Sequence, residues 1–455
     1  MAELGELRAF NQPTKFITAK AEHLRAVLTY VRDRNFREQA YKASITVASE
    51  KGPNEQVIIL DEGDVRSWQE SKAKNPDGGL HNNASIMDEI LRLRQEKASV
   101  LGFPSYFDMA QVHNRAQPTV ELQQWLDDLI NHIKPLALKE YNEVKQFAKE
   151  QGLNDFEPWD TAYYTEQLRR KRYSFTEEEV QNYFPVDRVL SGLFELVKAL
   201  FGVHIEDIDA CIPADERWHP DVRLFEVKED DGGGVIGRFL LDLHRRIGKV
   251  KTCYHKPIRS RRRDTNGKLV TPVSYLTCSF KVRPTADGGP LLLVPSEVET
   301  LFHEFGHLLH HQLTRMEYAA ITGTNNVPRY AIESPSMFME EWCQDRRTLG
   351  RISGHYKDKT PLPDDLFNNI LAARKFQRAS NFLSQLEYAL IDTELNSIDA
   401  EGRDAQDILD SLGDQAYVVP RPDYDRRRNS ESHWFGTRSP TTYYMYVCMG
   451  KNPRL

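Results

Sequence analysis

The chain has 455 residues, of which 40% are hydrophobic and 28% are charged, a composition typical of a soluble globular protein with enough core for more than one domain. Its formal net charge of −7 disfavours a general nucleic-acid binder, because such proteins need a basic surface that displaces counterions. The five cysteines are odd in number and show no CxxC spacing, which argues against a disulfide framework and favours a reducing compartment.

The first half of the chain predicts helices. Residues 1–23 show no cationic-then-apolar signal pattern and read as an N-terminal extension, and no apolar run approaches the length of a membrane span. Residues 24–205 form a helical region in which apolar side chains recur every three or four residues, most clearly in Ser85–Leu101 and Val120–Gln151. The polar segment Pro53–Asn83 is rich in Gly, Asn and Asp and predicts a long surface loop.

The pattern changes from residue 206 onward. Three short runs of β-type residues, separated by glycine-containing turns, predict a small sheet at Val222–Val227, Gly237–Leu243 and Val273–Phe280. A helix follows this sheet, and Pro361–Ser397 returns to helical periodicity. We therefore expect a mainly α-helical fold in which a small β-sheet lies beside one central helix.

That central helix carries the clearest motif of the chain, HEFGH at residues 303–307. His303 and His307 are four residues apart, so both imidazoles lie on one face of a helix at the spacing of zinc ligands. Glu304 projects beside that face, where a carboxylate can take a proton from water on the metal. Gly306 lowers helix stability by roughly 1 kcal/mol relative to alanine, which suggests that another segment packs closely there.

The surroundings of the motif support the helix. Ser296 and Glu299 have the spacing of a capping box, in which the two residues satisfy each other's free backbone donors at a helix start. An apolar face on a different arc from the histidines is formed by Val298, Leu301, Phe302, Phe305, Leu308 and Leu309. The sequence therefore predicts a helix that is buried on one side and carries a metal site on another.

A catalytic zinc usually has three protein ligands, so a third must come from elsewhere. His310 and His311 lie one turn further on the same helix and fit its surface better than a tetrahedral site, and Glu317 follows too closely after that helix. Glu333 is the stronger candidate, because the turn-rich residues 322–328 can reverse the chain before a second helix at residues 333–342.

Glu340 lies seven residues after Glu333 and so on the same face of that second helix. This position suits a carboxylate that accepts a hydrogen bond from a metal-binding histidine and orients its ring. For both carboxylates the alternative is a solvated place on the helix surface.

Together these stretches resemble the thimet oligopeptidase family of zinc metallopeptidases, closest to its oligopeptidase A branch. The resemblance runs from about Arg34 to Tyr446 and is carried by Phe156–Tyr164, Arg217–Arg223, Thr300–His310, Glu333–Ser336, Glu341–Cys343 and Gln385–Leu390. It implies a zincin-type fold with helical channel walls, one zinc ion per chain held by His303, His307 and Glu333, and Glu304 as the general base. It also implies short, unstructured peptides as substrates.

A later family motif maps onto residues 432–446. His433, Tyr443 and Tyr446 fall on the family's positions, and the resemblance implies that they stabilise the oxyanion of the tetrahedral intermediate. On sequence alone, tyrosines at this spacing belong more often to a core.

The chain also departs from the family pattern. The family's Gly-Gly-Tyr is Thr437-Arg438-Ser439 here, and a Gly-containing segment expected after Lys249 reads Val250–Lys256, within a basic run that ends at Arg263. A basic run of this kind predicts a solvated loop, with a site for an anionic partner as the alternative. Compared with the family the chain begins late and stops early, so we expect residues 206–455 to be a catalytic region that is C-terminally truncated.

The leading hypothesis is a cytoplasmic, monomeric metalloendopeptidase that takes part in peptide degradation, with no nucleic-acid or membrane partner. The runner-up is a catalytically impaired relative that binds zinc and peptides without cleaving them, which the altered residues 437–442 favour. A third possibility, a nucleic-acid-associated protein, depends on the basic residues 245–263 alone.

Overall fold

The computed structural model describes residues 84–114, 119–209, 217–230, 232–246, 249, 252–281, 283–284, 288–397, 408, 411–420 and 434. The chain divides into two compact units, of which one is Arg170–Phe376 and the other combines Met1–Arg169 with Gln377–Leu455. The division expected from the sequence, at residues 23 and 205, stays a prediction. The predicted loop Pro53–Asn83 lies outside the described residues.

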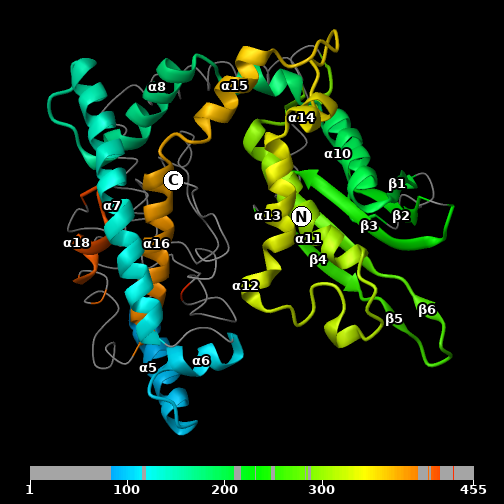
Figure 1. Cartoon of the computed structure of the whole chain (residues 1–455), viewed down its shortest axis with the longest axis horizontal. Helices are drawn as coiled ribbons and strands as arrows, with labels where there is room; N and C mark the ends of the chain where they lie inside the picture. Colours follow the sequence, from blue (N-terminus) through cyan, green and yellow to red (C-terminus); the bar gives the residue numbers. More distant parts are fainter. Residues whose placement is uncertain are drawn as a thin grey trace, which may run out of the picture. The chain divides into compact units, whose positions relative to one another are not determined.

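The unit Arg170–Phe376 is built on a five-stranded mixed sheet of order β1-β2-β3-β7-β4 (Figure 1). Its strands are β1 (Val203–Asp207), β2 (Arg223–Glu229), β3 (Val235–His244), β4 (Tyr254–Arg259) and β7 (Val273–Phe280). Neighbouring strands are antiparallel except β3 and β7, which run parallel. Short two-stranded ladders join β5 (Arg262–Arg263) to β6 (Leu269–Val270) and β8 (Arg283–Pro284) to β9 (Leu291–Leu292).

The predicted strands correspond to β2, β3 and β7, whereas β1 and β4 are absent from the prediction. Strand β4 contains Lys256, Pro257 and Arg259, and none of its six residues is buried. It lies at the edge of the sheet, where proline and cationic side chains are tolerated because one row of backbone groups needs no partner strand. An edge strand of this composition lacks the apolar alternation by which strands are recognised.

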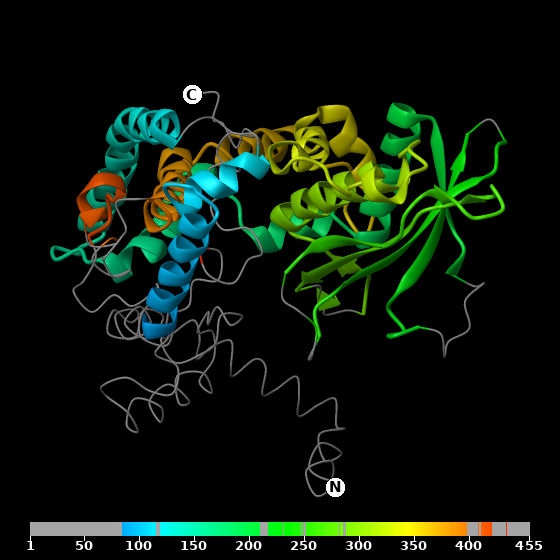
Figure 2. The ribbon, with the colours of Figure 1, turned by 90° about the horizontal axis from the view of Figure 1, so that it is seen from below.

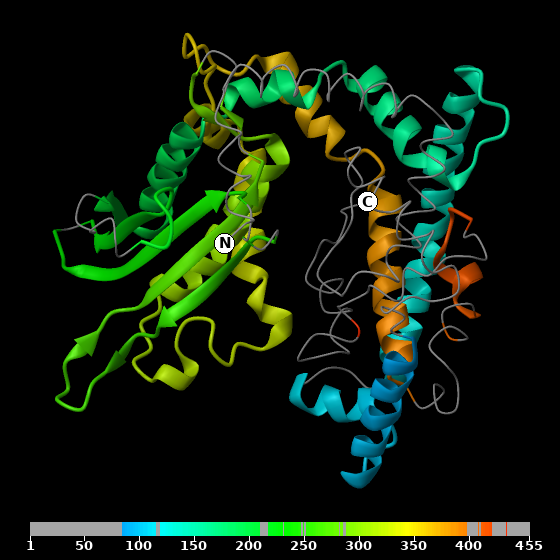
Figure 3. The same cartoon turned by 180° about the vertical axis from the view of Figure 1, so that it is seen from behind.

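Helices cover one face of this sheet (Figures 2 and 3). The helices that follow α8 (Thr161–Tyr173) in this unit are α9 (Glu177–Val180), α10 (Val186–Phe201), α11 (Pro295–Gln312), α12 (Arg329–Ile332), α13 (Ser334–Glu341), α14 (Arg346–Ile352) and α15 (Asp364–Ala373), with 3-10 turns η3 (Gln181–Tyr183), η6 (Ala319–Ile321) and η7 (Trp342–Gln344). Helix α11 packs against β7, β4 and β3 and pairs closely with α13, while α10 packs against β1 and α14. Helix α11 is therefore held between the sheet and α13.

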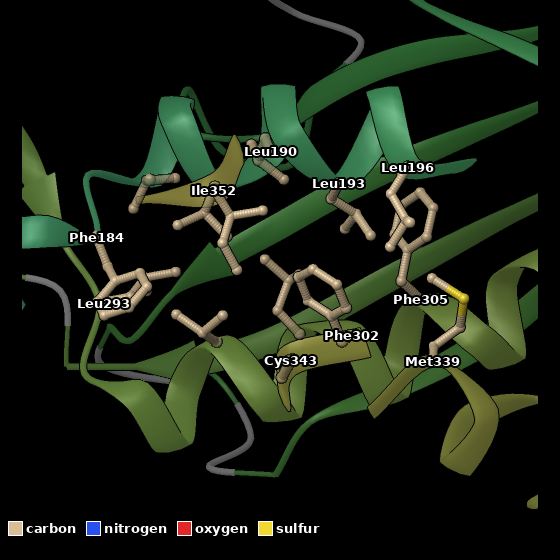
Figure 4. Close-up of a cluster of buried hydrophobic side chains, with 14 of the residues drawn as sticks. Phe184, Leu190, Leu193, Leu196, Leu293, Phe302, Phe305, Met339, Cys343 and Ile352 are labelled. Atoms are coloured by element: carbon tan, nitrogen blue, oxygen red, sulfur yellow. The ribbon is translucent and has the colours of Figure 1, made fainter. Parts of the chain in front are cut away.

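The core of this unit lies between α10, α11 and the sheet (Figure 4). Figure 4 shows side chains from α10, α11, α13 and α14 pointing toward one another, namely Leu190, Leu193, Leu196, Phe302, Phe305, Met339 and Ile352. Phe305 also meets the ring of Phe239 on β3 edge to face, with centroids 5.7 Å apart. Burying each such side chain contributes about 1.5–3 kcal/mol, so α11 is fixed by its apolar face. All six residues predicted for that face are buried, which confirms the prediction.

The second unit is helical in its described part. It contains α5 (Ala84–Val100), α6 (Tyr106–Asn114), α7 (Thr119–Glu150), η2 (Pro158–Asp160), most of α8 (Thr161–Tyr173), α16 (Arg378–Leu395) and α18 (Gly413–Ala416). Its core forms mainly between α7 and α16. The two long helices predicted in the first half of the chain agree with α5 and α7 to within one residue at each end. No helix within the described ranges has both the length and the hydrophobicity needed to cross a membrane.

The helical periodicity predicted over Pro361–Ser397 is confirmed, and the segment forms two helices. Helix α15 ends at Ala373 and α16 begins at Arg378, and Gln377 between them adopts a left-handed backbone with φ of 54°. The Glu140 carboxylate accepts the backbone N–H of Ser380 at 2.8 Å and so satisfies a free donor at the start of α16. Apolar periodicity continues across the break between α15 and α16, so the break cannot be predicted from that periodicity.

Candidate metal centre

Helix α11 begins two residues earlier than the predicted capping box requires. Val294 is the N-cap and Pro295 occupies the first turn, which places Glu297 at the third helical position. The Glu297 carboxylate accepts the backbone N–H of Val294 at 3.1 Å and caps the helix. The capping role predicted for Ser296 and Glu299 is therefore wrong, although the predicted helix is present.

Three side chains from two helices converge beside α11. His303 and His307 lie on one face of α11 with their ring centroids 5.0 Å apart. Glu333, the N-cap residue of α13, directs Oε2 to within 3.2 Å of His303 Nε2 and 3.0 Å of His307 Nε2. Within the part of the chain that the structure describes, these residues form the one group of three or more potential ligands whose donor atoms all lie within 4.8 Å of one another.

The donor set and its spacing fit a zinc ion. Two imidazole nitrogens and one carboxylate oxygen are a usual ligand set for a catalytic zinc, and ligands about 2.0–2.1 Å from a tetrahedral ion lie about 3.4 Å apart. The nitrogen-to-oxygen distances of 3.0 and 3.2 Å are close to that value. The three ligands predicted from the sequence are therefore brought together by the fold.

Two further groups orient these ligands. His303 donates from Nδ1 to Glu340 Oε1 at 2.5 Å, which leaves Nε2 directed at Glu333. The Ser336 hydroxyl donates to Glu333 Oε2 at 2.9 Å and to the Glu333 carbonyl oxygen at 2.8 Å. Glu340 thus occupies the position expected of an orienting acceptor. Ser336 was not anticipated, although a serine three residues after a carboxylate in a first helical turn is a detectable signal.

The charges at this site favour a cation. Burial lowers the pKa of His303, but hydrogen bonds with Glu333 and Glu340 outweigh burial and raise that pKa to about 9. Burial raises the pKa of Glu333, and its hydrogen bonds with His303 and His307 hold that pKa well below the usual range instead. Because the two carboxylates favour a positive charge between them, the same arrangement would attract a divalent metal.

Glu304 lies next to this centre and is only 8% exposed. Burial raises the pKa of its carboxyl group, while His303, His307 and a hydrogen bond from the backbone N–H of His255 act in the opposite direction. A carboxylate whose pKa is moved upward toward neutrality is better matched to proton transfer. The contribution of His255 was not predicted, because β4 itself was missed.

The close approach inferred from Gly306 is confirmed. A Cβ atom at this position would lie 2.4 Å from the Pro335 carbonyl oxygen and 2.4 Å from Ser336 Cα. Helices α11 and α13 can therefore pack closely enough for Glu333 to reach the two histidines only if residue 306 has no side chain.

The other residues considered as ligands have different roles. His311 is fully buried, not exposed at the helix surface as predicted, and its Nε2 lies 3.1 Å from the Arg259 carbonyl oxygen. Glu317 accepts hydrogen bonds from Arg261 and Arg263. His310 is half-buried and lies outside the converging group.

The basic run 245–263 is not a solvated loop in its described part, because it contains β4 and the start of the β5–β6 ladder. Arg246 and Lys249 both bind the buried Asp242 carboxylate, each at 2.7 Å. Arg261 and Arg263 bind Glu317, as described above. These four cations are paired with acidic residues of the chain, which weakens the case for an anionic partner.

Three residues predicted to stabilise an oxyanion, His433, Tyr443 and Tyr446, lie outside the described residues, as does the altered segment 437–442. Trp434 is described. Its indole N–H donates to the Tyr388 carbonyl oxygen at 3.3 Å.

Comparison with known proteins gives one family and several relatives. The model of the family described as Peptidase family M3 matches residues 65–447. Over 428 residues the chain is 37% identical to oligopeptidase A of Escherichia coli (strain K12). The aligned region covers 92% of this chain and 58% of that protein. Over 452 residues it is 36% identical to oligopeptidase A of Salmonella typhimurium, covering 98% of this chain and 62% of that protein.

A plant relative is also similar. The organellar oligopeptidase A of Arabidopsis thaliana, chloroplastic/mitochondrial, is 33% identical over 440 residues, covering 94% of this chain and 51% of that protein. The chain thus spans between 51% and 62% of the length of these three relatives.

Proposed function

The chain belongs to peptidase family M3, and from that premise we propose that it is a zinc-dependent oligopeptidase that hydrolyses short, unstructured peptides. The observation that carries this proposal is the convergence of His303, His307 and Glu333 beside the buried carboxylate of Glu304. We propose peptides as substrates because the relatives are named as oligopeptidases. This chain spans only part of the length of those relatives.

The proposed ligands of the zinc ion are His303 Nε2, His307 Nε2 and one carboxylate oxygen of Glu333. When bound, zinc supplies a Lewis acid that lowers the pKa of water toward about 7 and polarises the peptide carbonyl group. Glu340 holds the His303 ring by accepting its Nδ1–H, and Ser336 holds the Glu333 carboxylate. These second contacts keep the three donor atoms directed at one point.

Glu304 is the proposed general base. It lies on α11 between the two histidines, its side chain is nearly buried, and the backbone N–H of His255 donates to its carboxylate. In this role Glu304 takes a proton from the attacking water and then gives that proton to the leaving amine. Burial raises the pKa of Glu304, which makes the carboxylate a stronger base toward the attacking water.

Stabilisation of the oxyanion is assigned by resemblance to His433, Tyr443 and Tyr446, whose N–H and O–H groups are suitable donors. A cytoplasmic location is also proposed, because five cysteines without a disulfide framework suit a reducing compartment. The monomeric state belongs to the same proposal.

The test is cleavage of a quenched fluorescent peptide of about ten residues, a length suited to an extended chain in a cleft. Zinc-loaded protein is compared with protein treated with a chelator and then resupplied with zinc. Cleavage that stops with the chelator and returns with zinc supports the proposal. Protein that binds zinc stoichiometrically, stays folded and leaves every peptide of a mixed library intact would refute it.

A further inference from the structure

Two cysteines lie opposite each other on neighbouring chain segments of the sheet, close enough to the proposed general base for its charge to act on both. Strands β4 and β7 are antiparallel, with Tyr254 opposite Thr277 and His255 opposite Leu276. One further step of this register places Cys253 opposite Cys278. Opposite residues on antiparallel strands have Cα atoms about 4.5–5.5 Å apart, within the roughly 4.4–6.8 Å that a disulfide bond spans.

Both thiols lie on the face of the sheet that α11 covers. Cys278 belongs to the buried row of β7, which alternates with the partly exposed Tyr275 and Ser279, and it is fully buried. Cys253 is on the same side as His255, whose ring lies 5.5 Å from that of His311 on α11. A hydrogen bond joins the two thiols, and the Glu304 carboxylate is near enough to act on the charge of both. The two thiols thus lie on the face of the sheet against which the helix of the candidate site packs.

The two thiols differ in the way that a redox pair requires. Cys253 is partly exposed, and the hydrogen bond from Cys278 and a further one from the backbone N–H of Ser279 lower its pKa although burial raises it. Burial raises the pKa of Cys278 well above its usual range. An accessible thiol with a lowered pKa forms the thiolate that attacks an oxidant. A buried partner with a raised pKa stays protonated during that first step.

We propose that Cys253 and Cys278 form a redox-active dithiol that is reversibly oxidised to a cross-strand disulfide. With a small-molecule disulfide as the oxidant, the Cys253 thiolate attacks one sulfur, forms a mixed disulfide and expels the first thiolate. Cys278 then loses its proton and attacks the Cys253 sulfur, which forms the protein disulfide and expels the second thiolate. The protein loses two electrons and two protons, and the oxidant is reduced to two thiols.

Oxidation is coupled to the candidate site through two residues of backbone. His255, whose N–H holds the Glu304 carboxylate, follows Cys253 by two positions at the edge of the sheet. A disulfide at Cys253 ties this edge strand to β7 and changes the position of that N–H relative to Glu304. We therefore expect the oxidised protein to show a kcat lowered about tenfold or more with its zinc content unchanged, a consequence that rests on the proposed peptidase function.

The experiment oxidises the whole zinc-loaded chain with glutathione disulfide and maps its peptides by mass spectrometry without reduction. A peptide pair linked through Cys253 and Cys278, lost on treatment with a phosphine reductant, is the expected result. The variant Cys278→Ala is expected to accumulate a glutathione adduct on Cys253, because no partner is present to expel it. The variant Cys343→Ala, which changes a buried cysteine of η7, is expected to keep the Cys253–Cys278 link.

A wild-type protein that remains fully reduced, or that carries only glutathione adducts, overturns the dithiol. Because the mass map needs no activity, a linked pair in a protein that never cleaves peptides refutes the proposed function and leaves the dithiol in place. A linked pair with kcat unchanged overturns the coupling to Glu304.

Discussion

Gly306 on α11 lies against Pro335 on α13 so closely that a single added methyl group would be 2.4 Å from the Pro335 carbonyl oxygen. The neighbours of this position are backbone atoms, which cannot rotate away as a side chain can. The same contact sets the distance between His307 on one helix and Glu333 before the other. The absence of a side chain at residue 306 thus determines whether the donor atoms of the three proposed ligands can converge.

Gly306→Ala is therefore expected to destabilise the protein by about 1–3 kcal/mol, the usual cost of overpacking a core, although alanine is the better helix former. Because α13 must shift, zinc affinity is expected to fall as well. Urea unfolding and a competitive zinc titration measure the two effects.

The matched control is Gly350→Ala on α14, where an added methyl group would meet no atom within 4 Å. This variant is expected to be neutral or more stable by up to about 1 kcal/mol. Equal stability of the Gly306→Ala protein and the wild type would contradict the close approach of the two helices.

Glu340 is expected to strengthen zinc binding by orienting His303. Replacing it by glutamine removes the charged acceptor of the Nδ1–H at nearly constant volume, and loss of such a partner typically lowers metal affinity about 10–100-fold. Glu341→Gln is the control, because Glu341 is exposed on the same helix and binds Gln344 instead. Zinc affinities of the two variants are compared by competition with a chromogenic chelator, and an unchanged affinity for Glu340→Gln would exclude the orienting role.

His255 is expected to make the metal-free protein sensitive to mild acid. Burial, followed by the nearby His311, His307 and His310, lowers its pKa from 6.5 to about 3. Because the unfolded chain then binds a proton that the folded chain does not, stability contributed by neutral His255 is complete above pH 6.5 and is lost as the pH falls toward 3. At about pH 5 the loss amounts to about 2 kcal/mol.

His255→Leu keeps the backbone N–H and removes the titration. The difference in urea stability between pH 7 and about pH 5 is expected to be smaller in this variant by about 2 kcal/mol. Identical pH dependence of the variant and the wild type would contradict the lowered pKa, because it would show that His255 binds a proton equally well in the folded and unfolded chains.

The convergence of the three proposed ligands, which the structure shows, could be predicted from the sequence because it depends on local geometry. His303, Glu304 and His307 are set by helical spacing alone, and Glu333 follows from a turn and a second helix start. His255 and the Cys253–Cys278 pair depend on which strands lie side by side, and β4 has too little apolar alternation to be recognised. Helix ends are hard to predict for a similar reason, since the α15–α16 break depends on Glu140, more than two hundred residues away in sequence.

The most direct test of the central claim, that residues 303–307 and Glu333 form a hydrolytic zinc centre, is the initial cleavage rate of the zinc-loaded Glu304→Gln protein beside the wild type. The account predicts equal, stoichiometric zinc in both proteins and a cleavage rate at least about a hundredfold lower in the variant, because general-base catalysis contributes that much. Glu304→Gln protein that cleaves the same peptide at the wild-type rate would contradict it.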